Sequence, residues 1–322
     1  MSLPKSPFAP SSATPGAGEI KLSLLPPGRQ VLTSFTYQYP LKLVAPDPHA
    51  VHEDKHVTVV FLLTYGGGLV GGDKIDLKVD IDPLTRLVLV TQGSTKLFKS
   101  QNRSIVSGQI LDVKISAGGS LCYLPDPTQP FAESVYEQRQ TFYVDPSGAS
   151  SLLMLDWVSE GRRAREESWN LWQWKGRNEV REHHPTTRGR LLLRDAVTLS
   201  NEGFGGIGLA QKTENMGIFG TLIIYGPIFN TLGEYFVKHF ASQPRIGAKD
   251  FSDDSKCHVP DPNLVQEKLD GLLWTAASVR GFVLVKFGAK EIDGARRWLG
   301  RLLRDEGTVE RHFGHQALIC LR

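Results

Sequence analysis

The fold class is decided by residues 74–81, which read Lys-Ile-Asp-Leu-Lys-Val-Asp-Ile. Polar and apolar residues alternate without a break, so the four apolar side chains lie on one face of an extended strand. A helix would scatter the same side chains around its circumference. The segment therefore predicts a β-strand with one buried face and one solvated face.

Further strands of two kinds are indicated along the chain. The same alternation recurs at residues 111–116 and 137–144, and turn formers such as Asp82-Pro83 and Gly118-Gly119 separate the runs. Continuously apolar segments, typical of strands buried on both faces, lie at residues 57–65, 87–91, 152–158, 188–198, 221–225 and 283–287. Because few helices separate these runs, they predict a mainly β fold of mostly antiparallel strands.

The C-terminal half contains the helical patterns. Apolar residues from Ile292 to Leu303 recur at steps of three and four, and between them lie Arg296, Arg297, Arg301 and Arg304. This pattern predicts an amphipathic helix whose basic face is most simply solvated. Weaker patterns at residues 232–240 and 264–274 bring the expectation to two or three short helices.

One domain, residues 19–322, is expected because no linker divides the chain. Residues 1–18 hold four prolines among Ser, Ala and Gly, which predicts a disordered lead. Residues 242–263 are polar and are broken by Pro244, Pro260 and Pro262, which predicts a loop or insertion.

Composition excludes several classes of protein. The 322 residues carry 37 Lys and Arg against 34 Asp and Glu, and a net charge of +3 is too small to indicate a nucleic-acid or membrane-surface partner. Cys122, Cys257 and Cys320 form no Cys-x-x-Cys pair, which argues against a disulfide framework or zinc ribbon and suits a reducing compartment. Since no stretch resembles a membrane span or signal peptide, a cytoplasmic protein is expected.

Two motifs suggest enzymes, and neither has the structural context that its chemistry needs. His52-Glu53-Asp54-Lys55-His56 matches the H-E-x-x-H pattern of zinc peptidases, which requires a helix, yet β-branched residues follow at once. Residues 66–72 match part of a dinucleotide-binding pattern, but a strand follows where a helix is required. A metallopeptidase and a nucleotide-binding enzyme stay open as alternatives, and a polar loop and a tight turn are the simpler interpretations.

The C-terminus offers another candidate metal site. His312, His315 and Cys320 place two imidazoles and a thiol close together in the sequence, a set that suits Ni²⁺, Cu²⁺ or Zn²⁺. A terminal pair of histidines is more often simply exposed or packed, so this remains a candidate only.

Five sequence blocks resemble, in the same order, the UreD family of urease accessory proteins, called UreH in some bacteria. The blocks lie at residues 39–43, 67–73, 91–96, 124–132 and 156–162. The resemblance runs from about residue 22 to the C-terminus and looks closer to eukaryotic members than to many bacterial ones.

The resemblance implies a non-catalytic scaffold in the maturation of nickel-dependent urease. Members of the family bind a helical UreF-like partner, through it a UreG-like GTPase, and together they dock on apo-urease. Nickel is then transient Ni²⁺ cargo that passes through an internal tunnel, not a permanently bound cofactor. The fold that the resemblance implies is a β-helix-like stack of strands with few helices.

Residues of the blocks are the candidates for this nickel route, because Ni²⁺ moving through a protein needs oxygen or imidazole ligands that release it again. Asp73, Asp126 and Asp156 are the candidate ligands, although an Asp beside Gly or Pro usually caps a turn. Lys96 and Arg162 are expected to pair with these carboxylates. The other block residues, either structural or along the route, are Gly71, Gly72, Gln92 and Thr95.

Three tryptophans crowd a short segment and bear on partner binding. They are Trp169, Trp172 and Trp174, and the alternation puts the last two on one strand face. Core packing is the simplest interpretation of a tryptophan, and a patch for a protein partner is the alternative.

Overall fold

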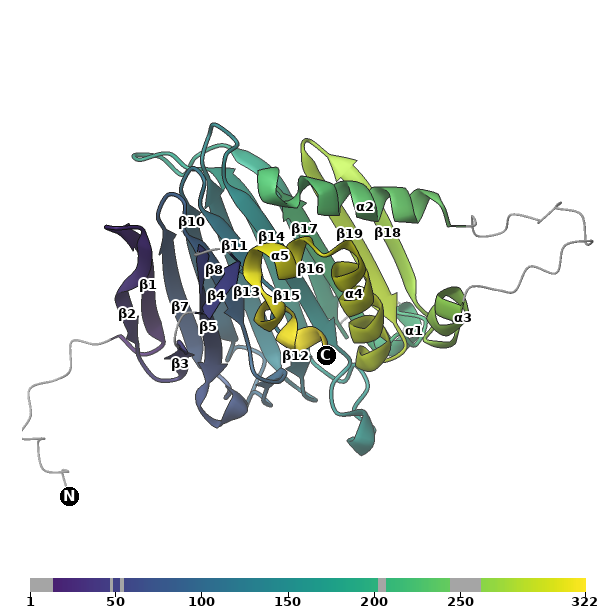
Figure 1. Ribbon diagram of the computed structural model, residues 1–322. Coiled ribbons are helices and arrows are strands. Elements are labelled where there is room, and N and C mark those ends of the chain that lie inside the picture. The colour runs from purple at the N-terminus through teal and green to yellow at the C-terminus, as the bar shows by residue number, and fades with distance from the viewer. Residues whose placement is uncertain (1–13, 47–48, 53–54, 202–206, 244–261) are drawn as a thin grey trace, which may run out of the picture.

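The computed structural model describes residues 14–46, 49–52, 55–201, 207–243 and 262–322. Two stacked β-sheets make up most of it, and helices of the C-terminal half lie against the outer face of the larger sheet (Figure 1). The prediction of a mainly β protein with a few C-terminal helices is confirmed.

The smaller sheet has seven strands, and one face of this sheet is solvated. In spatial order they are β16 (Leu191–Ser200), β15 (Gln173–Glu182), β13 (Val135–Val144), β10 (Ser107–Ile115), β7 (Lys74–Ile81), β1 (Ala17–Leu25) and β2 (Arg29–Tyr37). In β7 the four apolar side chains are buried and the alternate residues are mostly exposed, as the period of two predicts.

The larger sheet has twelve strands, and its central ones are buried on both faces. Its main path runs through β18 (Leu273–Val279), β19 (Phe282–Ala289), β17 (Ile218–Tyr225), β14 (Ser151–Ser159), β11 (Ser120–Tyr123), β8 (Arg86–Val90), β5 (Lys55–Thr64) and β3 (Leu41–Val44). The short strands are β4 (His49–His52), β6 (Gly68–Leu69), β9 (Thr95–Leu97) and β12 (Thr128–Pro130). Five of the six continuously apolar segments therefore lie in the larger sheet. The sixth, at residues 188–198, is wrong as a strand buried on both faces, because it forms β16, a partly exposed edge strand of the smaller sheet.

The expected antiparallel pairing is wrong. Within the described residues, ten strand pairs are parallel and seven are antiparallel. From β7 to β15 the chain crosses to the other sheet after each long strand, so neighbours within one sheet run in the same direction. Polar and apolar alternation and turn-forming residues are the same for parallel and antiparallel strands. The strand direction is decided by whether the chain crosses to the other sheet between neighbouring strands. The β-helix-like form of the stack stays a prediction.

Two apolar layers hold these elements together, and the central strands of the larger sheet contribute to both. One layer fills the space between the sheets, with Leu77 and Leu111 on one side and Leu89 and Leu152 on the other. The second layer lies between the larger sheet and the C-terminal helices, where Leu155 packs in the same cluster as the helical residues. Burial of this size is the main stabilising term of the fold.

The helices agree in part with the sequence patterns. α4 (Ile292–Glu306) and α2 (Asn230–Ala241) form where they were predicted, whereas the pattern at 264–274 contains α3 (Pro262–Leu269) followed by the start of β18. The short helical elements are α1 (Leu209–Lys212), α5 (Thr308–Phe313), and the 3-10 turns η1 (Tyr65–Gly67), η2 (Arg163–Arg165), η4 (Pro227–Phe229) and η5 (His315–Leu321). Among the helices that the structure describes, none is long and apolar enough to cross a bilayer.

The predicted N-terminal lead and the predicted internal loop fall mostly outside the described residues. Of the lead at 1–18, residues 1–13 lie outside, and β1 begins at Ala17. Of the loop at 242–263, residues 244–261 lie outside, and α3 begins at Pro262.

Candidate functional site

Three parallel strands of the larger sheet bring two of the candidate carboxylates near one another. β8, β11 and β14 run side by side in register, with Leu89 beside Tyr123 and Tyr123 beside Met154. Thr91 follows β8 and Asp126 follows β11, while Asp156 lies within β14. Because the ends of parallel strands share one edge of a sheet, residues far apart in the sequence meet there.

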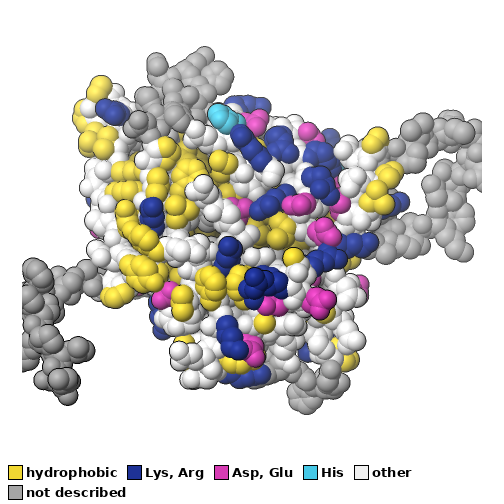
Figure 2. Space-filling model, turned by 90° about the horizontal axis from the view of Figure 1, so that it is seen from below, with side chains coloured by type: hydrophobic (Ala, Val, Ile, Leu, Met, Phe, Trp, Pro, Cys, Tyr) yellow, Lys and Arg dark blue, Asp and Glu magenta, His cyan; other side chains and the backbone are white. Residues whose placement is uncertain are grey.

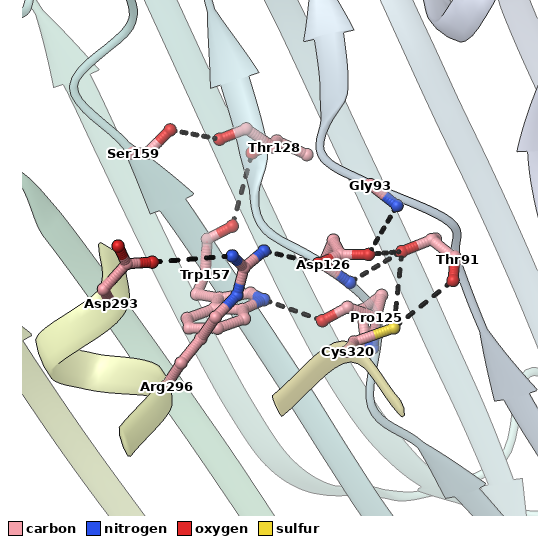
Figure 3. Close-up of polar contacts among 10 residues, drawn as sticks. All are labelled: Thr91, Gly93, Pro125, Asp126, Thr128, Trp157, Ser159, Asp293, Arg296 and Cys320. Carbon is pink, nitrogen blue, oxygen red and sulfur yellow. Dashed lines mark hydrogen bonds and ion pairs between the residues drawn. The ribbon is translucent and has the colours of Figure 1, made fainter. Parts of the chain in front are cut away.

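Asp126 is buried and fully hydrogen-bonded (Figure 3). Its Oδ2 accepts hydrogen bonds from the Thr91 hydroxyl at 3.1 Å and from the Gly93 backbone N–H at 2.8 Å. Its own N–H donates to Thr91 Oγ1 at 2.6 Å. These hydrogen bonds hold the loop after β8 against the loop after β11.

The cation that pairs with Asp126 is Arg296 of α4. Arg296 Nη2 lies 2.6 Å from Asp126 Oδ1, and its Nη1 lies 3.7 Å from Asp293 of the same helix (Figure 3). Arg297 and Arg301 reach Asp270 and Glu267 at 2.6 Å each. The interpretation of this basic face as simply solvated is therefore wrong, because three of its arginines are ion-paired across segments.

Cys320 packs beside the same carboxylate as a neutral thiol. Its Sγ lies 3.3 Å from the Thr91 carbonyl oxygen, to which it donates. Burial, followed by the charge of Asp126, raises the pKa of the Cys320 thiol to about 12. A thiol ligates a metal as the thiolate, so this environment disfavours metal binding at Cys320.

The structure does not gather the C-terminal candidates into a metal site. His315 is exposed while Cys320 is buried, and His312 uses its carbonyl oxygen to accept a hydrogen bond from Arg86. Across the ranges that the structure describes, no three His, Cys, Asp or Glu side chains are grouped to hold a metal ion.

Asp156 lies between the two sheets and is held by amides. Gln138 Nε2 donates to its Oδ1 at 2.8 Å, and Asn178 Nδ2 donates to its Oδ2 at 2.7 Å. Burial raises the pKa of the Asp156 carboxyl, and the nearby Asp195 raises it too, while the two amide donors lower it. Asp156 keeps part of its surface open because it borders a hollow space on each side.

Three hollow spaces follow one another through the stack, and the candidate carboxylates lie where they adjoin. An open cleft of about 480 Å³ borders Asp156, which it shares with a small cavity of about 20 Å³ between the sheets. That cavity shares Thr91 and Asp126 with an open pocket of about 530 Å³ beside Arg296 and Cys320. A cavity of about 15 Å³ or more can hold one water molecule, so the middle space has room for a small ion.

Other candidate residues lie away from this row of spaces. The Asp73 carboxylate accepts a hydrogen bond from the Val70 N–H at 3.0 Å, which is the turn-capping role, and Gly72 donates its N–H to Ser107. Lys96 is exposed on β9, and Arg162 pairs with Glu167, so the expected pairing of these cations with the three aspartates is wrong.

Three further block residues have simple placements. Gly71 lies close to the backbone of Ser100, where a Cβ would be crowded at 3.2 Å. Gln92 borders the open pocket beside Asp126, and Thr95 borders the small middle cavity. Both side chains are therefore placed along the row of spaces.

Neither enzyme-like motif has the required helix. His52 ends β4 and His56 lies in β5, which pair as antiparallel strands, while Glu53 and Asp54 lie outside the described residues. Residues 65–69 form η1 and β6, and β7 follows at Lys74. The H-E-x-x-H peptidase site and the dinucleotide site are thus both contradicted by the local backbone.

The tryptophans divide between core and surface. Trp169 and Trp174 are buried in the layer between the sheets, and Trp174 Nε1 donates to Thr128 Oγ1 at 3.2 Å. Trp172 precedes β15 and is partly exposed, with the Arg103 guanidinium 5.4 Å from its ring centre. Core packing is confirmed for two of the three.

Sequence reasoning missed several polar residues inside the stack. Gln140, Asn178 and Asp195 lie opposite one another on β13, β15 and β16, and all three are buried. The signal was present, because Gln138 and Gln140 share the strand face of Phe142 and Val144, which a half-buried strand turns inward. The sequence pattern does not reveal the ion pair of Arg296, because its partner Asp126 lies 170 residues away.

The fold and the site define a class: a mainly β protein in which buried carboxylates and amides line a row of adjoining hollow spaces. The family model described as UreD urease accessory protein matches residues 16–318, so the chain belongs to that family.

Relatives from several kingdoms agree with this assignment. The chain is 29% identical over 283 residues to a urease accessory protein ureD-like chain of Schizosaccharomyces pombe, covering 87% of this chain and 91% of that one. It is 29% identical to Urease accessory protein 4 of Cryptococcus neoformans, covering 84% of each. It is 35% identical to Urease accessory protein UreD of Sorangium cellulosum, covering 66% and 62%.

Proposed function

We propose that this protein is a cytoplasmic, non-catalytic maturation factor for urease that works with UreF-like and UreG-like partners on apo-urease and passes Ni²⁺ to it. The observation that carries the proposal is the row of three spaces joined at Asp156 and Asp126. Family membership supplies the urease context. Nickel is cargo in this function and no permanently bound cofactor is involved.

The chemistry of the row suits an ion in transit. Ni²⁺ accepts oxygen ligands, and conduction requires binding that is favourable at entry and weak enough for release. Asp156 and Asp126 supply single carboxylates at successive junctions, where a closed set of three or four strong ligands would retain the ion. Two amides already hold Asp156 in position, so the carboxylate needs little rearrangement to contact a passing cation.

Surface features support protein partners more than nucleic acid. On the face seen from below in Figure 1, hydrophobic side chains gather over one part, and acidic and basic side chains are intermixed over another (Figure 2). Large exposed apolar side chains include Tyr39, Val70 and Leu84. A gathered apolar surface is typical of interaction sites, whereas single exposed apolar residues are ordinary, and mixed charge gives no single-sign field for a polyanion.

The test is urease activation at limiting nickel. Urease is co-expressed with its accessory proteins and with the wild-type chain, with no chain, or with the Asp126→Asn/Asp156→Asn double variant, and both activity and bound nickel are measured. Asp73→Asn is the matched control, because Asp73 caps an outer turn and lies off the row. We expect loss of both signals without the chain and in the double variant, and normal values in the control.

Two results would contradict the proposal. Urease that acquires nickel and activity equally well without the chain excludes the maturation role. A double variant that is folded, as judged by its unfolding midpoint, and that activates urease normally excludes the route through Asp126 and Asp156.

A further inference from the structure

The open cleft is lined at one level by polar residues from both sheets. On the smaller sheet, Asp195 of β16 lies opposite Asn178 of β15. On the larger sheet, Asp156 of β14 lies opposite Thr221 of β17, which in turn lies opposite Lys286 of β19. All five residues border the cleft. These five residues form a polar band across a cleft whose walls are otherwise mostly apolar, and this band is called the polar level below.

One ion pair spans this level from sheet to sheet. Lys286 Nζ of the larger sheet lies 2.5 Å from Asp195 Oδ1 of the smaller sheet. The Lys286 side chain is 45% exposed, whereas the Asp195 side chain is 8% exposed. The Lys286 ammonium can move into solvent because its side chain is long, flexible and partly exposed, whereas the Asp195 carboxylate is short and stays buried.

Two buried oxygen atoms without a hydrogen-bond partner lie on the strands beside Asp195, one on β15 and one on β13. Asn178 Oδ1 and Gln140 Oε1 accept no hydrogen bond within the described structure, although their residues are 2% and 1% exposed. Asn178 lines the cleft, and Gln140 lines the small cavity that adjoins it at Asp156. Unsatisfied buried acceptors are rare because each loses its interaction with water, and they indicate a missing cation or donor.

From this arrangement we infer that the level of Asp195, Asn178 and Asp156 is a loading site for a divalent cation, and that the Lys286 ammonium occupies the cation's place until the cation arrives. The inference rests on the proposed function and adds an entrance to it. The incoming cation contacts the two carboxylates and the amide oxygen, and Lys286 swings into solvent. The exchange replaces one positive charge by two, and the two acidic side chains at this level compensate the added charge.

Nickel binding to the purified full-length chain, measured by isothermal titration calorimetry with NiCl₂, tests the loading site directly. Lys286→Met removes the competing ammonium and is expected to bind nickel about two- to fivefold more tightly, the strength of a partly exposed ion pair. Asp195→Asn removes a ligand and is expected to bind about tenfold more weakly. The controls are Lys175→Met and Glu137→Gln, since this pair is 3.0 Å apart and exposed, and neither residue lines the cleft.

The outcomes separate this inference from the proposed function. Tighter binding by Lys286→Met and weaker binding by Asp195→Asn, with unchanged controls and unfolding midpoints, support the loading site. Binding by Lys286→Met that is no tighter than wild type, or full binding by Asp195→Asn, overturns it even if urease activation still depends on the chain. Conversely, urease that matures without the chain overturns the proposed function, and the calorimetric result stands on its own.

Discussion

At the scale of single residues, Asp126 shows how one side chain can unite distant parts of the chain. Its carboxylate accepts hydrogen bonds from Thr91 and Gly93 and pairs with Arg296, which lies 170 residues further on. Gly93 adopts φ of +80°, a conformation that glycine reaches without strain, and this turns its N–H toward the carboxylate. The network ties β8, β11 and α4 together.

Removal of the Asp126 carboxylate should destabilise the protein strongly. Asp126→Ala leaves two donors and the Arg296 guanidinium without their acceptor, and we expect a loss of about 2 to 4 kcal/mol in the free energy of unfolding. The measurement is the urea midpoint at neutral pH. Asp293→Ala is the control, because Asp293 contacts the same arginine from an exposed position and should cost less than about 0.5 kcal/mol. Equal midpoints for the two variants would contradict this account.

At the scale of elements, the β15–β16 pair is organised around one carboxylate. Glu179 of β15 is fully covered, and it accepts hydrogen bonds from Arg181, Arg188 and Arg194. β16 is the edge strand of the smaller sheet, where charged side chains discourage pairing with another chain. Glu179 therefore allows several arginines to crowd this edge without mutual repulsion.

The pH dependence of stability should reveal this cluster. Burial raises the pKa of Glu179, but the hydrogen bond and charge of Arg181 and the charges of Arg194 and Arg188 outweigh it, so the pKa is lowered overall. The stabilisation is present above the unfolded-state pKa of about 4.3 and is lost as pH falls through the lower folded-state pKa. Glu179→Gln should therefore cost about 1 to 2 kcal/mol at neutral pH and progressively less in acid.

Urea unfolding of wild type and Glu179→Gln between about pH 7 and about pH 3.5 measures this difference. Glu182→Gln is the matched control on the same strand, because Glu182 pairs with the largely exposed Arg190 and should show a small effect at every pH. A gap between wild type and Glu179→Gln that widens in acid would show that the sign is wrong.

At the scale of the whole molecule, the central strands of the larger sheet join the two apolar layers. Leu89 and Leu152 face the layer between the sheets, while Val88 and Leu153, their chain neighbours, face the layer under the helices. Alternation along each strand thus gives both layers a share in the same backbone. Loss of either layer exposes one face of the shared sheet.

The two layers should unfold together. Leu299→Ala in α4 and Val79→Ala in β7 create cavities in different layers, and we expect losses of about 2 to 5 and about 1 to 3 kcal/mol respectively. Each should lower a single midpoint that far-ultraviolet circular dichroism and tryptophan fluorescence report identically. Separate transitions by the two probes in either variant would show that the layers are independent domains.

Sequence periodicity by itself determined the mainly β character, the buried face of strands such as β7, and where α2 and α4 lie, because these depend on local alternation and helical spacing. Sequence blocks determined the family, which the family model confirms. Sequence did not predict the parallel direction of the strands, the Arg296 partner of Asp126, or the meeting of Asp195 with Lys286. These depend on contacts across 91 and 170 residues. Only the crossing of the chain between two sheets brings such residues together, since no short-range pattern records which distant strand a given strand will lie beside.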